Sequence, residues 1–128
     1  MHGSVTAAGD ISISSAGRID MDDNAIVNAG TATIGMTANG DVVLGSLQTD
    51  NATVAAVQVT SFNGGVIDGG DAAVEIVANA PGAIVTLDAA TGIGTVVGLG
   101  ADSALEVEIS VLDASLTSSL ATLYTMLL

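Results

Sequence analysis

A run of oxygen-bearing side chains near the start of the sequence has the spacing of a metal-binding loop. Asp20, Asp22 and Asn24 alternate, with Asp23 between them, as the first ligands of a calcium loop do. The pattern then departs from such loops, because Ala25 stands where the turn glycine is needed. We therefore name Asp20, Asp22, Asp23 and Asn24 as candidate ligands for weak calcium binding, with a solvated turn as the alternative.

Catalytic side chains are scarce. Arg18 lies beside this acidic run, and an arginine among carboxylates is what a polysaccharide-cleaving β-helix would use, but a surface ion pair explains it as well. The only imidazole is His2, close to the terminus, so a serine nucleophile has no base in the core. The chain has no cysteine, which excludes thiolate chemistry and disulfides. We predict that the protein is not an enzyme and needs no organic cofactor.

Two further patterns imitate binding sites. The segment 91–98 (TGIGTVVG) resembles a dinucleotide-binding glycine loop, but no helix start follows it, so we predict a corner between strands. The segment Asp68-Gly69-Gly70-Asp71 is interpreted as a corner in the same way. Several threonines suggest an ice-binding array on one face of the solenoid. Their spacing is irregular, however, and threonine is an ordinary strand residue, so we favour the strand interpretation. The threonines considered are Thr31, Thr33, Thr37, Thr49, Thr53 and Thr60.

The charge of the chain excludes several partners. Fourteen acidic residues against one Arg or Lys give a formal net charge of −13. Neutralising phosphates and releasing their counterions needs several cationic side chains, so nucleic acid and anionic membrane surfaces are poor partners. No apolar run approaches the length of about 20 residues that crosses a bilayer, and we expect no membrane insertion.

Short strands are the elements that must position these side chains. Apolar and polar residues alternate with the two-residue period of a half-buried strand, at Ile11/Ile13, Val42/Leu44, Val57/Val59, Val74/Ile76 and Val107/Ile109/Val111. Corners rich in Asn, Asp and Gly separate them, for example at 38–40 and 62–65. The sequence therefore predicts an all-β fold, and a parallel β-helix, or β-solenoid, rather than a sandwich.

A glycine spacing of about thirty residues organises the chain. Glycine recurs at Gly9, Gly40, Gly70 and Gly100, and aspartate follows the first three directly. We predict solenoid repeats over 9–114, each unit being either one long coil or about one and a half shorter coils. Residues 1–8 are expected to be a flexible segment or a cloning remnant.

The C-terminal stretch allows two interpretations. Alternating β-branched residues favour a strand over 105–112. Leucines spaced by three, four and seven, after a capping-box pattern at Ser103 and Glu106, indicate a helix instead. We expect 115–128 to form a cap, a helical one or a frayed segment, over the last coil.

The order of several short motifs resembles the repeats of giant filamentous-haemagglutinin-like bacterial surface adhesins. The likeness covers about 9–115 and rests on 40–49 (GDVVLGSLQT), 64–68 (GGVID), 85–94 (VTLDAATGIG) and 104–114, with its ALEV and VLDA motifs. It implies a right-handed β-helical shaft on a secreted or surface-attached protein. The amino-terminal secretion domain of that family is missing from this sequence, so we expect a piece of a longer array.

We therefore expect a non-catalytic shaft segment of an extracellular adhesin or matrix protein. Two other functions remain open, a self-assembling filament subunit and a calcium-responsive binding module. The expected partners are further copies of the chain, stacked end to end, or a host or matrix surface.

Overall fold

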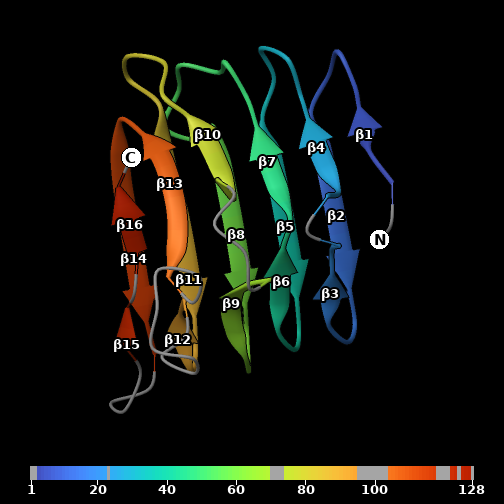
Figure 1. The fold of residues 1–128 in the computed structure, drawn as a ribbon, viewed down its shortest axis with the longest axis vertical. Helices are drawn as coiled ribbons and strands as arrows, with labels where there is room; N and C mark the ends of the chain where they lie inside the picture. Colours follow the sequence, from blue (N-terminus) through green and yellow to red (C-terminus); the bar gives the residue numbers. More distant parts are fainter. Residues whose placement is uncertain are drawn as a thin grey trace.

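The structure is a computed structural model that describes residues 3–22, 24–69, 74–94, 104–117, 122–123 and 125–127. These residues form sixteen short β-strands and no helix, which confirms the all-β prediction. The strands belong to three parallel sheets, here called A, B and C, and the chain visits the sheets in turn. The fold is therefore a parallel β-solenoid (Figure 1).

Each sheet collects every third strand. Sheet A contains β1 (Val5–Thr6), β4 (Ile26–Asn28), β7 (Ser46–Gln48), β10 (Ile76–Ala78), β13 (Leu105–Ile109) and β16 (Thr125–Leu127). Sheet B contains β2 (Ile11–Ser15), β5 (Ile34–Ala38), β8 (Val57–Ser61), β11 (Ile84–Ala89) and β14 (Val111–Leu116). Sheet C contains β3 (Ile19–Asp20), β6 (Val42–Leu44), β9 (Gly65–Asp68), β12 (Gly92–Ile93) and β15 (Thr122–Leu123).

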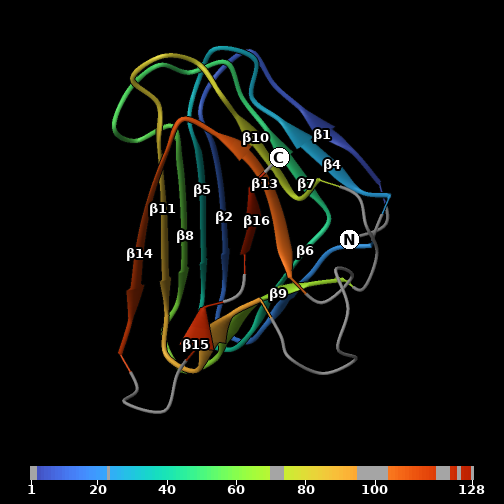
Figure 2. The ribbon, with the colours of Figure 1, turned by 60° about the vertical axis from the view of Figure 1, so that its left-hand side comes forward.

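The coil is right-handed. In Figure 1 the strands of sheet A rise on the near side and those of sheet B descend behind them, while the chain advances from right to left. Figure 2 shows the three sheets around a common interior, with sheet B on the left and sheet A on the right. This handedness agrees with the expectation from the sequence.

Apolar side chains stack in columns that run through the interior from coil to coil. In sheet B one column is Ile11, Ile34, Val57, Val85 and Leu112, and a second is Ile13, Met36, Val59, Leu87 and Ala114. Sheets A and C contribute one column each, Val5, Val27, Leu47, Ile76 and Val107, and Ile19, Val42, Val66 and Ile93. All members of these columns between the first and last strands of each sheet are buried. Branched aliphatic side chains suit such columns, because they fit a pleated, half-buried surface.

The coil period is shorter than the glycine spacing. Along the first column of sheet B, successive members are separated by 23, 23, 28 and 27 residues, as the numbers Ile11, Ile34, Val57, Val85 and Leu112 show. Gly9 precedes β2 of sheet B, whereas Gly40 precedes β6 of sheet C, so the two glycines occupy different corners. The interval of 31 residues between the two glycines therefore spans one complete coil and about one further strand with its corner. This is close to the alternative of about one and a half coils for each glycine interval.

The two Gly-Asp pairs nevertheless act alike. Asp10 Oδ1 accepts a hydrogen bond from the backbone N–H of Thr33 at 2.9 Å, and Asp41 Oδ1 accepts one from the N–H of Gly65 at 2.9 Å. Each aspartate thus binds the backbone of the following coil. Gly70 and Gly100 lie outside the described residues.

Both ends of the chain differ from the sequence-based expectation. Val5–Thr6 form β1 and pair with β4, so part of 1–8 belongs to the solenoid and not to a flexible segment. After Ala114 the described residues form strands, in the remainder of β14 and in β15 and β16, so the predicted C-terminal helix is wrong for this part of the chain. Leu112, Ala114 and Leu116 are half-buried while Asp113 and Ser115 are exposed, which is the period of a strand. The predicted strand over 105–112 is confirmed, with a corner at Ser110 between β13 and β14.

Within the described residues, no helix has the length and apolar character that would be required to span a membrane.

Candidate functional site

The acidic run that the sequence singled out lies on the surface at the end of β3. Asp20 Oδ2 accepts a hydrogen bond from Arg18 Nη2 at 2.8 Å, and both side chains are more than half exposed. Asp20, Asp22 and Asn24 line one hollow of about 370 Å³, together with Met21, Val43 and Gly69. Asp23 lies outside the described residues.

The geometry of this run agrees with a surface turn. The N–H of Ala25 donates a hydrogen bond to the carbonyl of Asp22 at 2.9 Å, which closes the turn. The Arg18–Asp20 contact is the ion pair that we weighed against a catalytic cluster, and exposed pairs of this kind contribute about 1 kcal/mol or less. Calcium binding by these residues stays a prediction.

The glycine-rich segment and the threonines that the sequence singled out lie in ordinary strands and corners of the solenoid where the structure describes them. Gly92–Ile93 form β12, and the N–H of Gly94 donates to the carbonyl of Val66 at 2.8 Å, so this described part of the glycine-rich segment is ordinary sheet and corner. Thr37 and Thr60 are neighbours on sheet B, but Thr49 is buried beside a corner and donates to the carbonyl of Gly30. The described threonines therefore do not share one face.

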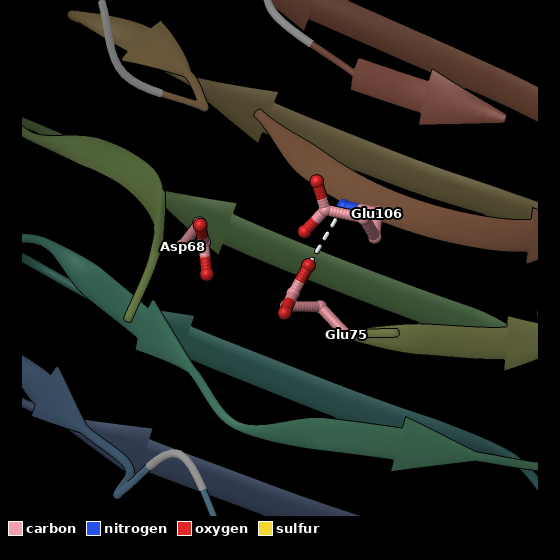
Figure 3. A group of neighbouring side chains, drawn as sticks. All are labelled: Asp68, Glu75 and Glu106. Carbon is pink, nitrogen blue, oxygen red and sulfur yellow. Dashed lines mark hydrogen bonds between the residues drawn. The ribbon is translucent and has the colours of Figure 1, made fainter. Parts of the chain in front are cut away.

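Three buried carboxyl groups form a second acidic cluster, which we call the carboxyl triad: Asp68, Glu75 and Glu106 (Figure 3). Asp68 ends β9, Glu75 immediately precedes β10, and Glu106 lies in β13. The three residues come from three successive coils, β7–β9, β10–β12 and β13–β15. Their exposed fractions are 4%, 2% and 2%. One carboxylate oxygen from each lies within 4.8 Å of the others, so that negative charges on these groups repel one another strongly.

Parallel pairing places these groups together. Asp68 lies beside Leu44 in sheet C and takes the position that a buried leucine holds in the preceding coil. Ile76 pairs with Val107, so Glu75 and Glu106 are adjacent one residue earlier in the two strands. The N–H of Glu75 donates to the carbonyl of Glu106 at 2.9 Å, and the N–H of Glu106 donates to Glu75 Oε2 at 2.7 Å. The side chain of Glu75 thus takes part in the pairing of two coils.

Burial determines the protonation of Glu75. The pKa of Glu75 is raised to about 9, mainly because its carboxyl group is removed from water and to a smaller extent because the carboxylates of Asp68 and Glu106 lie nearby. The hydrogen bond from the backbone of Glu106 opposes this rise in pKa. At neutral pH the Glu75 carboxyl group is therefore mainly protonated, which relieves the repulsion within the triad.

The sequence reasoning missed this cluster. It interpreted Asp68 as part of a corner and Glu106 as part of a capping-box pattern, and it gave Glu75, between Val74 and Ile76 of an expected strand, no role of its own. The signal that would have located the triad is the coil register, because Glu75 and Glu106 are 31 residues apart in sequence and adjacent in the sheet. The glycine spacing assigned that register only approximately.

No protein family, curated protein or solved structure matches this chain in the comparisons.

Proposed function

We propose that this chain is a non-catalytic structural segment, one stretch of the stiff shaft of an extracellular adhesin or matrix protein. The observation that carries the proposal is the continuity of the interior columns, in which one set of aliphatic side chains runs from coil to coil through all three sheets. The extracellular setting is supported by the resemblance of the sequence to filamentous-haemagglutinin-like repeats.

A shaft needs resistance to bending and to tension. Every internal strand of the three sheets is hydrogen-bonded to a neighbour on both sides along the solenoid axis. Side chains reinforce the same direction at the corners: Asn63 Nδ2 donates to Asn39 Oδ1 at 2.6 Å, and Ser61 Oγ donates to the carbonyl of Gly40 at 2.8 Å. Each coil is thus joined to the next by backbone pairing, apolar packing and polar side chains.

Single-molecule stretching of the full chain between handles at its two termini tests this function. We expect resistance well above that of an unfolded polypeptide, and extension in steps of one or a few coils. A coil of 23 to 28 residues would release roughly 80–100 Å of chain. Extension without measurable resistance would contradict a mechanical role.

A filament subunit is the second candidate, and the ends of sheet B favour it. Ile13 in β2 and Leu112 in β14 are only partly buried, although they are members of the interior columns. Strand β14 is the last strand of sheet B, so its outer edge is open to a strand of a second copy. If β2 of that copy takes this place, Ile13 follows Ala114 in the same column, and β1 of that copy gives up to β16 the place beside β13. Such strand addition satisfies both backbone edges.

Sedimentation velocity over a range of protein concentrations tests the filament function. We expect larger species at higher concentration for the natural sequence, and their loss in Ile13→Lys, which places a charge on the joining face. Val54→Lys is the matched control, because Val54 is 69% exposed and lies outside the strands. Concentration-independent sedimentation of the unsubstituted chain would contradict self-assembly.

A further inference from the structure

The carboxyl triad is a charged cluster that a purely structural shaft does not need. Asp68, Glu75 and Glu106 are among the few buried polar side chains of the described residues, and all three are acidic. They connect three coils that are otherwise joined by apolar columns and backbone pairing. Buried like charges at this separation repel each other strongly, and such a group usually becomes neutral instead.

The rest of the chain offers little cationic compensation. The sequence contains a single Arg or Lys, and this residue, Arg18, is bonded to Asp20 on the surface. The sequences of the strands beside the triad contain no basic side chain, namely β6, β7, β9, β10, β12, β13 and β16. Protons taken up from water are therefore the positive charge that can neutralise the carboxyl triad.

The ionisable groups on the neighbouring strands are few and acidic. Strands β6, β7, β10, β12 and β16 carry none, and β9 carries only Asp68. Strand β13 carries Glu106 and also Glu108, which is exposed and accepts a hydrogen bond from Asn79. Strand β11 also contacts β9, and its Asp88 alternates with the buried Leu87 and Ala89, so it belongs to the outer face of sheet B.

We propose that Asp68, Glu75 and Glu106 form a pH-sensitive lock that joins three successive coils while it holds a proton and loosens as the solution becomes alkaline. Glu75 is the central member. It accepts the hydrogen bond from Glu106 N–H and so connects its own coil to the next, while Asp68 approaches from the preceding coil. Ionisation of Glu75 places a second or third negative charge in this buried space and favours separation of the coils.

The direction of the effect follows from proton linkage. The pKa of Glu75 is about 9 in the folded chain against an ordinary value of 4.5, so between these limits the folded form binds more protons than the opened form. The contribution of Glu75 protonation is fully present below pH 4.5 and is lost as the pH rises through 9. Within that window each pH unit increases the ratio of open to closed chains about tenfold.

Urea unfolding of the full chain between pH 6 and pH 9, in the presence of a chelator, tests the lock. A carboxyl group with an ordinary pKa is already ionised at pH 6, so it contributes little to a change across this range. We expect the urea midpoint of the unsubstituted chain to fall steadily with rising pH. The midpoint of Glu75→Gln should be nearly constant, and at pH 9 it should exceed that of the unsubstituted chain, because glutamine keeps the hydrogen-bond acceptor without the charge.

Glu108→Gln is the matched control, since it removes an exposed carboxylate two residues beyond Glu106 in the same strand. It should retain the pH dependence of the unsubstituted chain. Equal pH slopes for the unsubstituted chain and Glu75→Gln would overturn the proposal. So would a midpoint that is independent of pH in chelator and rises on addition of calcium in the unsubstituted chain alone, because a cation would then compensate the triad.

A second measurement does not depend on whether a variant folds. The carboxyl carbon of Glu75 in the unsubstituted chain can be followed by NMR through a pH titration. A transition well above pH 7 is expected, and a transition near pH 4.5 would overturn the proposal.

Discussion

The carboxyl group of Glu75 accepts a hydrogen bond from the backbone N–H of Glu106 at 2.7 Å, across 31 residues of sequence. Substitution by alanine removes this acceptor and leaves a buried N–H without it, which costs about 1–3 kcal/mol. We therefore expect Glu75→Ala to lower the free energy of unfolding by that amount at pH 5. The free energy of unfolding of Glu75→Gln should stay close to that of the unsubstituted chain. Chemical denaturation at pH 5 measures this free energy for both variants. A Glu75→Ala chain as stable as Glu75→Gln would show that the bond contributes nothing.

The column through Ile76 predicts a large effect of charge in the interior. Ile76 is fully buried between Leu47 and Val107. An aspartate there would be a buried charge without a basic partner, so we expect Ile76→Asp to cost more than about 4 kcal/mol and to unfold the adjacent coils. Circular dichroism during heating measures the loss. Val54→Asp, at an exposed position, should leave the melting temperature nearly unchanged, and an equal result for the two variants would refute the burial of Ile76.

The close packing around Gly45 leads us to expect that a larger side chain at this position destabilises the fold. A Cβ atom added there would lie 2.5 Å from the carbonyl oxygen of Asp22 and 2.6 Å from that of Ala25, both backbone atoms of the preceding coil. Because the backbone must move to admit a methyl group, we expect Gly45→Ala to cost about 1–3 kcal/mol. Thermal unfolding tests this, with Gly9→Ala as the control, since nothing lies within 4 Å of a Cβ at Gly9. Unchanged stability of Gly45→Ala would contradict the close approach of the two coils.

The hydrogen bonds between Asp10 and Thr33 lead us to expect a loss of stability at acidic pH. Hydrogen bonds from the backbone and the side chain of Thr33 lower the pKa of Asp10 below its ordinary value of 3.8. The stabilisation is therefore present above pH 3.8 and is lost as the pH falls through the lower, folded value. NMR titration of the Asp10 carboxyl group should show a depressed pKa that rises part of the way in Thr33→Val, which keeps the N–H and removes the hydroxyl. An Asp10 pKa at 3.8 in both chains would contradict the contact between the coils.

The all-β architecture was predictable because the alternation of apolar and polar residues is visible within each strand on its own. Alternation at Ile11/Ile13 and Val57/Val59 shows the buried face of β2 and β8, and the corners between strands carry Asn, Asp and Gly. The coil length was not predictable from the glycines. Asp10 and Asp41 make the same hydrogen bond to the following coil at two different corners, so similar motifs recur at a distance that is not the coil period.

The C-terminal segment and the triad show two other limits of sequence reasoning. Leu112 and Leu116 are four residues apart, a spacing that suits one face of a helix and also one face of a strand, and pairing with Val85 and Ala89 of β11 decides for the strand. Asp68, Glu75 and Glu106 become neighbours only through the register of three coils. Their burial, which raises the pKa of Glu75, has no local signature in the sequence.

Stretching a core variant beside a surface variant tests most directly whether the interior columns carry the tension. Leu87 is fully buried in the second column of sheet B, between Val59 and Ala114, and Leu87→Ala should cost about 2–5 kcal/mol through the lost packing. We predict that Leu87→Ala lowers the force at which the coils around β11 extend, while Val54→Ala leaves the force of the unsubstituted chain unchanged. Identical force–extension curves for the three chains would contradict the proposal that the stacked core makes this protein a shaft.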